Sequence, residues 1–151
     1  MSKLSSALGT KFEQNKLSIL TRTFELGNHV FKVKVPTVGE IEEIYNYFKA
    51  PDEEVTEKIY QELIANLVVD PDDKIEKTDN DTIVEGRSMR EAARNKNILQ
   101  YRIVKYIQML VPETGSLDDL EYADVESEFP LAIQLTLVED REEHTSELQS
   151  H

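Results

Sequence analysis

The chain has 151 residues and a formal net charge of −13, from 17 basic and 30 acidic side chains. This length predicts a single domain with one hydrophobic core. The acidic balance argues against binding to nucleic acid or to an anionic membrane, because both need clustered cations. The absence of cysteine excludes disulfides, thiolate metal sites and cysteine nucleophiles. With no membrane-length apolar run and no secretory signal in residues 1–16, composition predicts a soluble intracellular protein.

The first 35 residues divide into an arm and a predicted β-hairpin. Residues 1–19 are polar and Ser-rich, so we expect a flexible or loosely docked arm. Between residues 20 and 35, the dipeptide Gly27-Asn28 is a turn signal between two runs rich in Thr, Phe and Val. Closing the hairpin there pairs Leu26 with His29 and Phe24 with Phe31, and a slip of one residue would mix the polar and apolar faces. The apolar face consists of Leu20, Phe24, Leu26, Phe31, Val33 and Val35.

Three helices and a loop are predicted after Pro36. The pattern from Thr37 to Glu40 is a capping box, which predicts a helix to about residue 49. A second helix is expected over residues 52–68, and the polar residues 70–85 read as a loop. A second capping box, from Ser88 to Glu91, predicts the longest helix, over residues 89–111.

The last third of the chain is predicted to be helical up to a tail. Ser116 and Asp124 are expected to cap short turns, and residues 131–138 fit either a strand or a helix, with a helix favoured by the helical neighbours. Residues 141–151 are expected to be a non-native, disordered tail. The reason is that EEHTSELQS looks like the translation of a common sequencing adapter.

Together these elements predict a mainly α fold of the α+β class, with an N-terminal β-hairpin packed on a small bundle of helices. Residues 20–140 are expected to form this single domain, between the arm at 1–19 and the tail. The core is predicted from the apolar face of each element. It comprises Phe24, Phe31, Val33, Ile41, Ile44, Phe48, Ile59, Leu63, Leu99, Ile103, Ile107 and Leu110.

The sequence contains no pattern that indicates catalysis, a cofactor or a metal ion. His29 is the only histidine before the suspected tail, which is insufficient for a zinc site or an ordinary catalytic triad. The acidic stretches beginning at Asp70 and Asp79 lack the glycine and glutamate positions of a calcium-binding loop. Neither a Walker loop nor a dinucleotide-binding glycine motif is present. We therefore expect no catalytic, cofactor-binding or metal-binding residues and no enzymatic activity.

The long helix has an unusual distribution of charge. Its basic residues fall on one side and its apolar residues roughly opposite, at 100° per residue. Two interpretations remain open: the basic ridge is a solvated face or pairs with the protein's own acidic helix, or it binds an acidic partner or a second copy of the chain. The ridge comprises Arg87, Arg90, Arg94, Arg102 and Lys105.

Four segments of the chain, in this order, resemble those of a known protein family. The hairpin FELGNHVFKVKVP leads into the capped helix TVGEIEEIYNYF. The later helix EGRSMREAARNKNILQYRIVKYIQMLVP leads to the acidic region DDLEYADVESEFPLAIQLTLVED. In order and in local sequence, these elements resemble tail assembly chaperones of long-tailed bacteriophages, and the resemblance covers about residues 20–140. It implies a non-enzymatic chaperone that binds the tape measure protein and keeps it soluble while tail tube protein assembles around it, in the cytoplasm of the host and not in the mature virion.

Two other functions compete with this one: a structural tail completion or tube-joining component of the virion, and an enzyme with a carboxylate site. For the chaperone, we expect the tape measure protein as partner, with the tail tube protein and a second copy of the chain as further candidates. Tyrosine suits a surface that is partly apolar and partly wet, and arginine can orient a charged partner. The candidate partner-binding residues are Tyr45, Tyr60, Arg90, Arg94, Tyr101, Arg102 and Tyr106.

Overall fold

The computed structural model describes the backbone of residues 3–149 and the side chains of residues 3–142. The chain is 59% helical, with six helices and two small antiparallel sheets in the described part, which confirms the predicted fold class. The helices are α1 (Lys3–Leu20), α2 (Val38–Lys49), α3 (Glu53–Ala65), α4 (Met89–Gln108), α5 (Tyr122–Glu128) and α6 (Leu131–Gln149). The strands are β1 (Thr21–Leu26), β2 (His29–Lys34), β3 (Ile75–Lys77), β4 (Thr82–Val84) and β5 (Arg87–Ser88).

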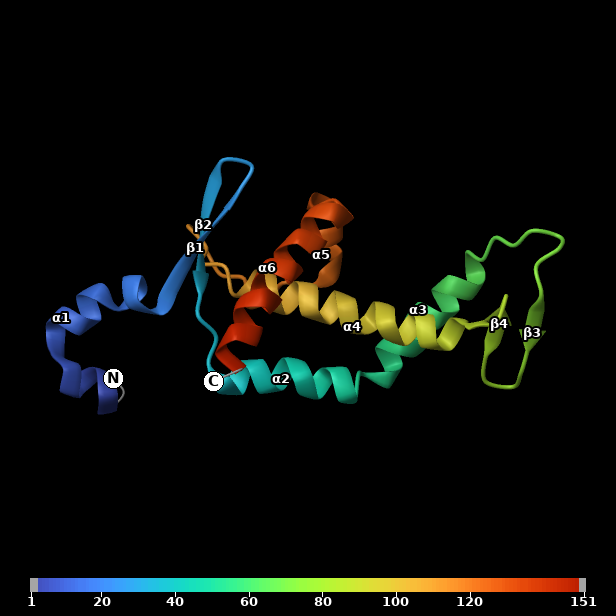
Figure 1. The fold of residues 1–151 in the computed structure, drawn as a ribbon, viewed down its shortest axis with the longest axis horizontal. Helices are drawn as coiled ribbons and strands as arrows, with labels where there is room; N and C mark the ends of the chain where they lie inside the picture. The colour runs from blue at the N-terminus through green and yellow to red at the C-terminus, as the bar shows by residue number, and fades with distance from the viewer. Residues whose placement is uncertain (1–2, 150–151) are drawn as a thin grey trace.

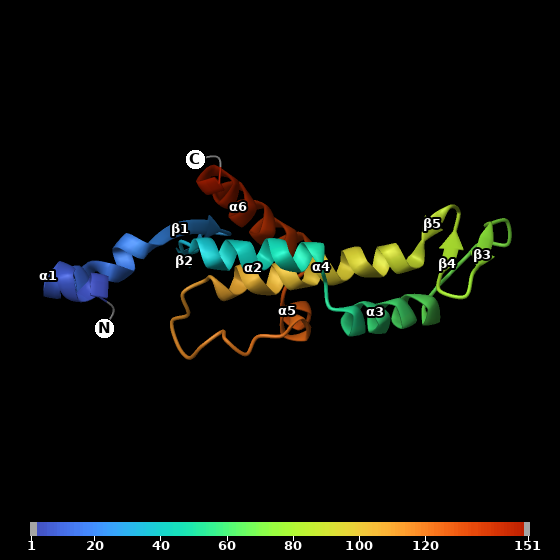
Figure 2. The ribbon, with the colours of Figure 1, turned by 90° about the horizontal axis from the view of Figure 1, so that it is seen from below.

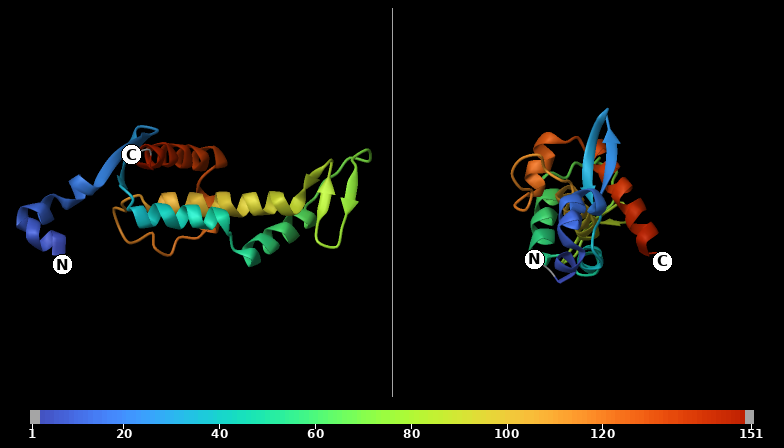
Figure 3. Two further views of the ribbon diagram at one scale, coloured as in Figure 1. Left: turned by 60° about the horizontal axis from the view of Figure 1, so that its bottom comes forward. Right: turned by 90° about the vertical axis from the view of Figure 1, so that its left-hand side faces the viewer.

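Helix α4 lies near the centre of the molecule, along its long direction (Figure 1). Seen from below, α2 runs antiparallel beside its C-terminal half and α3 antiparallel beside its N-terminal half (Figure 2). The hairpin β1–β2 stands at one end of α4 and the sheet β3–β4–β5 lies at the other, while α5 and α6 pack against the C-terminal half of α4 (Figure 3). The result is an elongated molecule in which the two ends of α4 have different neighbours.

The N-terminal hairpin forms with the predicted register. Phe24 pairs with Phe31 and Leu26 with His29, and Gly27 and Asn28 both adopt positive φ, as a two-residue turn of this kind requires. The segment after α4 lies along the free edge of β2. There, the Lys34 N–H donates to the carbonyl of Met109 at 2.8 Å, and the Val111 N–H donates to the carbonyl of Lys32 at 2.8 Å. This pairing is the partner that an isolated hairpin needs for stability.

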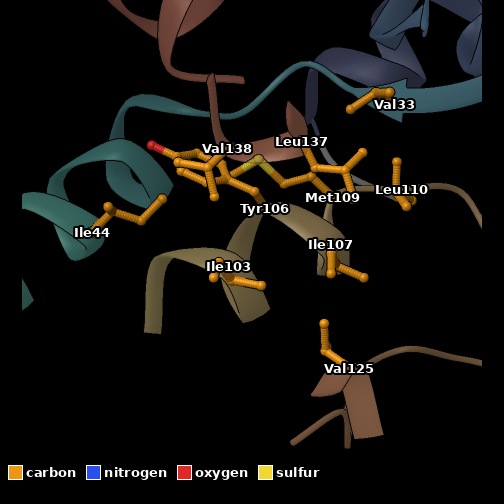
Figure 4. Packing of buried hydrophobic residues seen from close by; sticks show 10 residues of the cluster. All are labelled: Val33, Ile44, Ile103, Tyr106, Ile107, Met109, Leu110, Val125, Leu137 and Val138. Carbon is orange, nitrogen blue, oxygen red and sulfur yellow. The ribbon is translucent and has the colours of Figure 1, made fainter. Parts of the chain in front are cut away.

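The main core forms where β2, α2, α5 and α6 meet the C-terminal end of α4 (Figure 4). Ile103 is 1% exposed and Val33 is fully buried. Of the predicted core residues, seven are buried: Val33, Ile41, Ile44, Ile59, Ile103, Ile107 and Leu110. Four more are half-buried against one of the two clusters: Phe24, Phe31, Leu63 and Leu99.

The prediction for Phe48 was wrong, because this side chain is 52% exposed. It lies near the end of α2, where the neighbouring helix α4 is reached through Tyr47 instead. A smaller second cluster of Ile59, Tyr60 and Ala93 joins α3 to the N-terminal half of α4. The core therefore has two parts of unequal size along one helix.

Both predicted helix caps are present. The Thr37 side chain accepts from the Glu40 N–H, and the Glu40 carboxylate accepts from the Thr37 N–H, at 3.2 and 3.0 Å. At the start of α4, the Ser88 hydroxyl accepts from the Glu91 N–H at 3.1 Å. These local contacts fix where the two helices begin.

Three segments differ from the sequence-based expectations, and the structure resolves the ambiguity at a fourth. Residues 70–88 were predicted as a loop through residue 85, but they carry the three short strands β3, β4 and β5. The arm at 3–20 is helix α1, kinked at Gly9, where φ is +84°. The turn expected to be capped by Asp124 is helix α5, whose capping residue is Glu121, with Asp124 accepting from the Glu121 N–H. The ambiguous stretch 131–138 is helical, as favoured.

The tail also differs from the expectation of disorder as far as residue 149. Helix α6 runs through Gln149, and Glu142 forms an ion pair with Arg102. Arg141 is buried at 6% exposure beside Asp140. Residues 150 and 151, which belong to the same prediction, lie outside the described residues.

Candidate partner-binding surface

Two of the four candidate tyrosines are buried and unavailable to a partner. Tyr106 is 4% exposed in the main core, and Tyr60 is 8% exposed in the second cluster. The hydroxyls of Tyr60 and Thr82 lie 3.1 Å apart, within hydrogen-bond distance, which ties α3 to β4. Burial raises the pKa of Tyr106, in keeping with a phenol held inside the core. For these two residues, the structure supports a role in packing.

Tyr101 is half-buried and belongs to a stack between α4 and α2. Its ring lies parallel to that of Tyr47, with the ring centroids 3.7 Å apart. Its hydroxyl and the Lys105 ammonium both approach the Glu43 carboxylate, at 3.4 and 3.0 Å. Burial raises the pKa of Tyr101, although the nearby lysine opposes this shift. These contacts of Tyr101 and Lys105 join α4 to α2 of the same chain.

Arg90, in the predicted ridge, contacts residues of α3 and of the turn that leads into α4. Its guanidinium lies over the Tyr60 ring, 4.1 Å from the centroid, and forms an ion pair with Glu57 of α3. This contact lowers the pKa of Glu57, chiefly through the hydrogen bond from the arginine. The Arg90 backbone N–H donates to Asp81 at 2.9 Å.

Asp81 organises the turn that leads into α4. Its carboxylate accepts from the Ser88 hydroxyl and from the N–H groups of Thr82 and Arg90. Partial burial works to raise the pKa of Asp81, but these hydrogen bonds outweigh it and the pKa is lowered. Sequence reasoning treated this residue as part of a plain acidic loop, because its partners become visible only when β4 and β5 pair.

Three more ridge residues, Arg94, Arg102 and Lys105, also have partners within the chain. Arg94 donates to the carbonyls of Phe48 and Lys49 at the end of α2, at 3.4 and 3.3 Å. Such a placement is favourable, because the C-terminus of a helix carries partial negative charge. Arg102 pairs with Glu142 and Lys105 with Glu43. For four of the five ridge residues the structure thus shows pairing with acidic residues or a helix end of the same chain, whereas Arg87 is exposed.

A different surface, on α2, leaves large apolar side chains exposed. Val38 is 71% exposed, Phe48 52% and Tyr45 44%. Glu42 lies among them in sequence and is exposed, and it forms no ion pair within the described residues. We call Val38, Glu42, Tyr45 and Phe48 the α2 face. Tyr45 is the only one of the candidate partner-binding tyrosines that is exposed. Helical periodicity predicted Phe48 in the core, because the sequence does not distinguish the buried edge of an apolar stripe from its exposed edge.

A groove lined by many charged side chains begins at the end of α2. It has a volume of about 1200 Å³ and lies between α3, the start of α4 and the end of α2. Glu53, Glu54, Glu57, Lys58 and Arg90 are among its lining residues. Within the described residues, no group of three or more histidine, cysteine, aspartate or glutamate side chains is placed to hold a metal ion.

Within the described residues, none of the helices has the length and apolarity needed to cross a membrane. Comparison with protein families, with curated proteins and with solved structures finds no match to this chain.

Proposed function

We propose that this chain is a non-enzymatic tail assembly chaperone of a long-tailed phage. In this role it binds the tape measure protein in the host cytoplasm and keeps it soluble until the tail tube assembles. The observation that supports the proposal is the α2 face, which leaves Val38, Tyr45 and Phe48 exposed on a single helix. Exposed apolar side chains gathered on one helix are typical of a site that receives an amphipathic partner helix.

The charge of the chain fits the same role. A client helix with a large apolar surface aggregates unless its complex carries enough charge to stay in solution. A net charge of −13 supplies that repulsion. Glu42 within the α2 face, and Glu53 and Glu54 in the charged groove, would favour client segments in which lysine or arginine flanks the apolar stripe.

The test is a pull-down with fragments of the tape measure protein encoded in the same genome. Replacing Tyr45 and Phe48 together by serine should reduce recovery at least tenfold, because the substitutions remove exposed apolar surface without touching the core. The matched control is Val68→Ser with Val69→Ser, which removes apolar side chains that are 93% and 37% exposed after the end of α3. Full recovery by the double variant of α2, or no recovery by the parent chain, contradicts the proposal.

A second experiment separates the chaperone from a structural tail component. A chaperone leaves before the tail is complete, whereas a tail completion or tube-joining protein stays in the particle. Mass spectrometry of purified virions should therefore detect tube and tape measure peptides and no peptide of this chain. Detection in stoichiometric amount would favour the structural alternative.

The predicted role of the arginines can be tested in the same pull-down. Arg90, Arg94 and Arg102 could orient an acidic client segment only by giving up contacts that they make within the chain. Reversing all three to glutamate should thus lower thermal stability, whereas a direct role in binding predicts an additional loss of recovery that weakens as salt is raised.

A further inference from the structure

Helix α1 stands apart from the rest of the molecule. It extends beyond the hairpin, away from α2, α3 and α4 (Figures 1 and 2). Its kink at Gly9 divides it into two short helical pieces. Five of its large apolar side chains are between 45% and 67% exposed: Leu4, Leu8, Leu17, Ile19 and Leu20. Apolar side chains that gather on an exposed surface in this way are typical of interaction sites.

The charge of α1 is opposite to that of the remaining chain. Residues 1–20 contain three lysines and one glutamate, which gives them a net charge of +2 in a chain of net charge −13. Lys3, Lys11 and Lys16 have no ion pair within the described residues. The surface that fits α1 is therefore both apolar and acidic. The α2 face meets both conditions, with Val38, Tyr45 and Phe48 exposed around an unpaired Glu42.

The arm cannot reach the α2 face of its own chain. Helix α1 ends at Leu20 and β1 begins at Thr21, so no linker separates them. The junction is also held by hydrogen bonds, because the Val35 N–H donates to the carbonyl of Leu20 at 2.9 Å and the Thr21 hydroxyl donates to the carbonyl of Leu17. Since β1 is fixed in the hairpin, α1 keeps the direction in which the hairpin points it.

We infer that α1 of one chain docks on the α2 face of a second copy of this chain. The contact joins two different surfaces, an arm and a face, so reciprocal exchange of arms closes a dimer. Lysines of the arm then lie near Glu42 and the acidic start of α3, and the leucines cover Val38, Tyr45 and Phe48. The inference does not depend on the identity of any client. It does mean that α1 and the client of the proposed function would compete for the α2 face.

The test measures mass in solution by size-exclusion chromatography with light scattering, without any client. The parent chain should elute with at least twice the 17.4 kDa of one chain. An arm variant, Leu4→Ser with Leu8→Ser and Leu17→Ser, should be a monomer, and so should the face variant, Tyr45→Ser with Phe48→Ser. All five positions are exposed, so circular dichroism should show unchanged folding. The control, Val68→Ser with Val69→Ser, should assemble like the parent.

Mixing the two defective variants identifies which surfaces meet. The arm variant still has an intact α2 face and the face variant still has an intact arm, so a tagged arm variant should capture the face variant. Neither should capture an untagged copy of itself. A monomeric parent, a face variant that still assembles, or the absence of capture in the mixture would each overturn the inference.

Failure of this inference is distinguishable from failure of the proposed function. The arm variant keeps the α2 face, so it should bind tape measure fragments at least as well as the parent. If the parent is a monomer that still binds the fragments, the docking of α1 is wrong and the chaperone proposal stands. If it assembles through arm and face but binds no fragment, the reverse holds.

Discussion

The two halves of α4 pack by different means. From Leu99 to Gln108, the helix contributes Ile103, Tyr106 and Ile107 to an apolar cluster with β2, α2, α5 and α6. From Met89 to Ile98, it contacts mainly α3, through a small apolar cluster and a network of polar side chains. Burial of apolar area gives stability without direction, whereas hydrogen bonds are directional and costly to leave unmade. The C-terminal half thus holds the fold together, and the N-terminal half sets the position of α3.

Asn97 shows how the polar half works. It is 2% exposed and its amide donates to the carbonyl of Asp52 at 3.0 Å and to the Thr56 hydroxyl at 2.9 Å. Its carbonyl accepts from the Tyr47 hydroxyl at 2.8 Å. The Asn97 side chain thus forms hydrogen bonds to α2, to the N-cap residue of α3 and to the first turn of α3.

The largest effect is expected in the apolar half. Ile103→Ala removes a side chain that is 1% exposed and leaves a cavity, so we expect a loss of about 2–5 kcal/mol of unfolding free energy. Urea denaturation followed by circular dichroism measures it. Phe48→Ala, at a position that is 52% exposed, serves as the control and should cost less than about 0.5 kcal/mol. Equal losses for the two variants would mean that the core is not where the structure places it.

A smaller effect is expected for Asn97→Ala in the polar half. The substitution removes the partner of the Tyr47 hydroxyl and of the Thr56 hydroxyl, which should cost about 1–3 kcal/mol. Amide hydrogen exchange should also accelerate in the first turn of α3 more than in α6, because Asn97 holds the cap of α3. Uniform acceleration across the chain would contradict this local role.

Tyr60→Phe removes only a hydroxyl from the same region. The Tyr60 hydroxyl, within hydrogen-bond distance of Thr82, joins α3 to β4, so its loss should cost about 0.5–1.5 kcal/mol by thermal denaturation. Tyr45→Phe is the matched control, because the Tyr45 side chain is 44% exposed and its hydroxyl can bond to water. We expect no measurable change there.

The polar half should also weaken first in acid. The pKa values of Glu57 and Asp81 lie below their ordinary values of 4.5 and 3.8 in the folded chain. A lowered carboxyl pKa stabilises the fold above the ordinary value, and this contribution is lost as the pH falls below the ordinary value and through the lowered pKa. The difference in melting temperature between the parent and Asp81→Asn should therefore shrink over that range. A constant difference over that range would contradict this role of Asp81.

Local signals in the sequence were sufficient for the hairpin and for the starts of two helices. Gly27-Asn28 and the alternation around it specify one register, because a slip exposes Phe24 and Phe31. Thr37 and Ser88 mark helix starts through contacts that span three residues. These features depend on residues that are close together in the chain, so they can be predicted from the sequence alone.

The candidate surface was predicted less well than the fold. Tyr45 is exposed as expected, whereas Tyr60 and Tyr106 are buried. Helical periodicity identifies an apolar stripe but does not tell how much of it the neighbouring helix covers. For the same reason, Phe48 was expected in the core and lies on the surface.

By itself, then, the sequence determined the class of the fold, the register of β1 with β2 and the caps of α2 and α4. Only the tertiary structure decided the rest: the pairing of β3, β4 and β5, the partners of Arg90 and Arg94, and the exposure of the α2 face. The physical reason is the distance along the chain. Arg90 meets Glu57 and Arg94 meets the end of α2 across 33 and 45 or more residues, and such contacts exist only after the helices have packed.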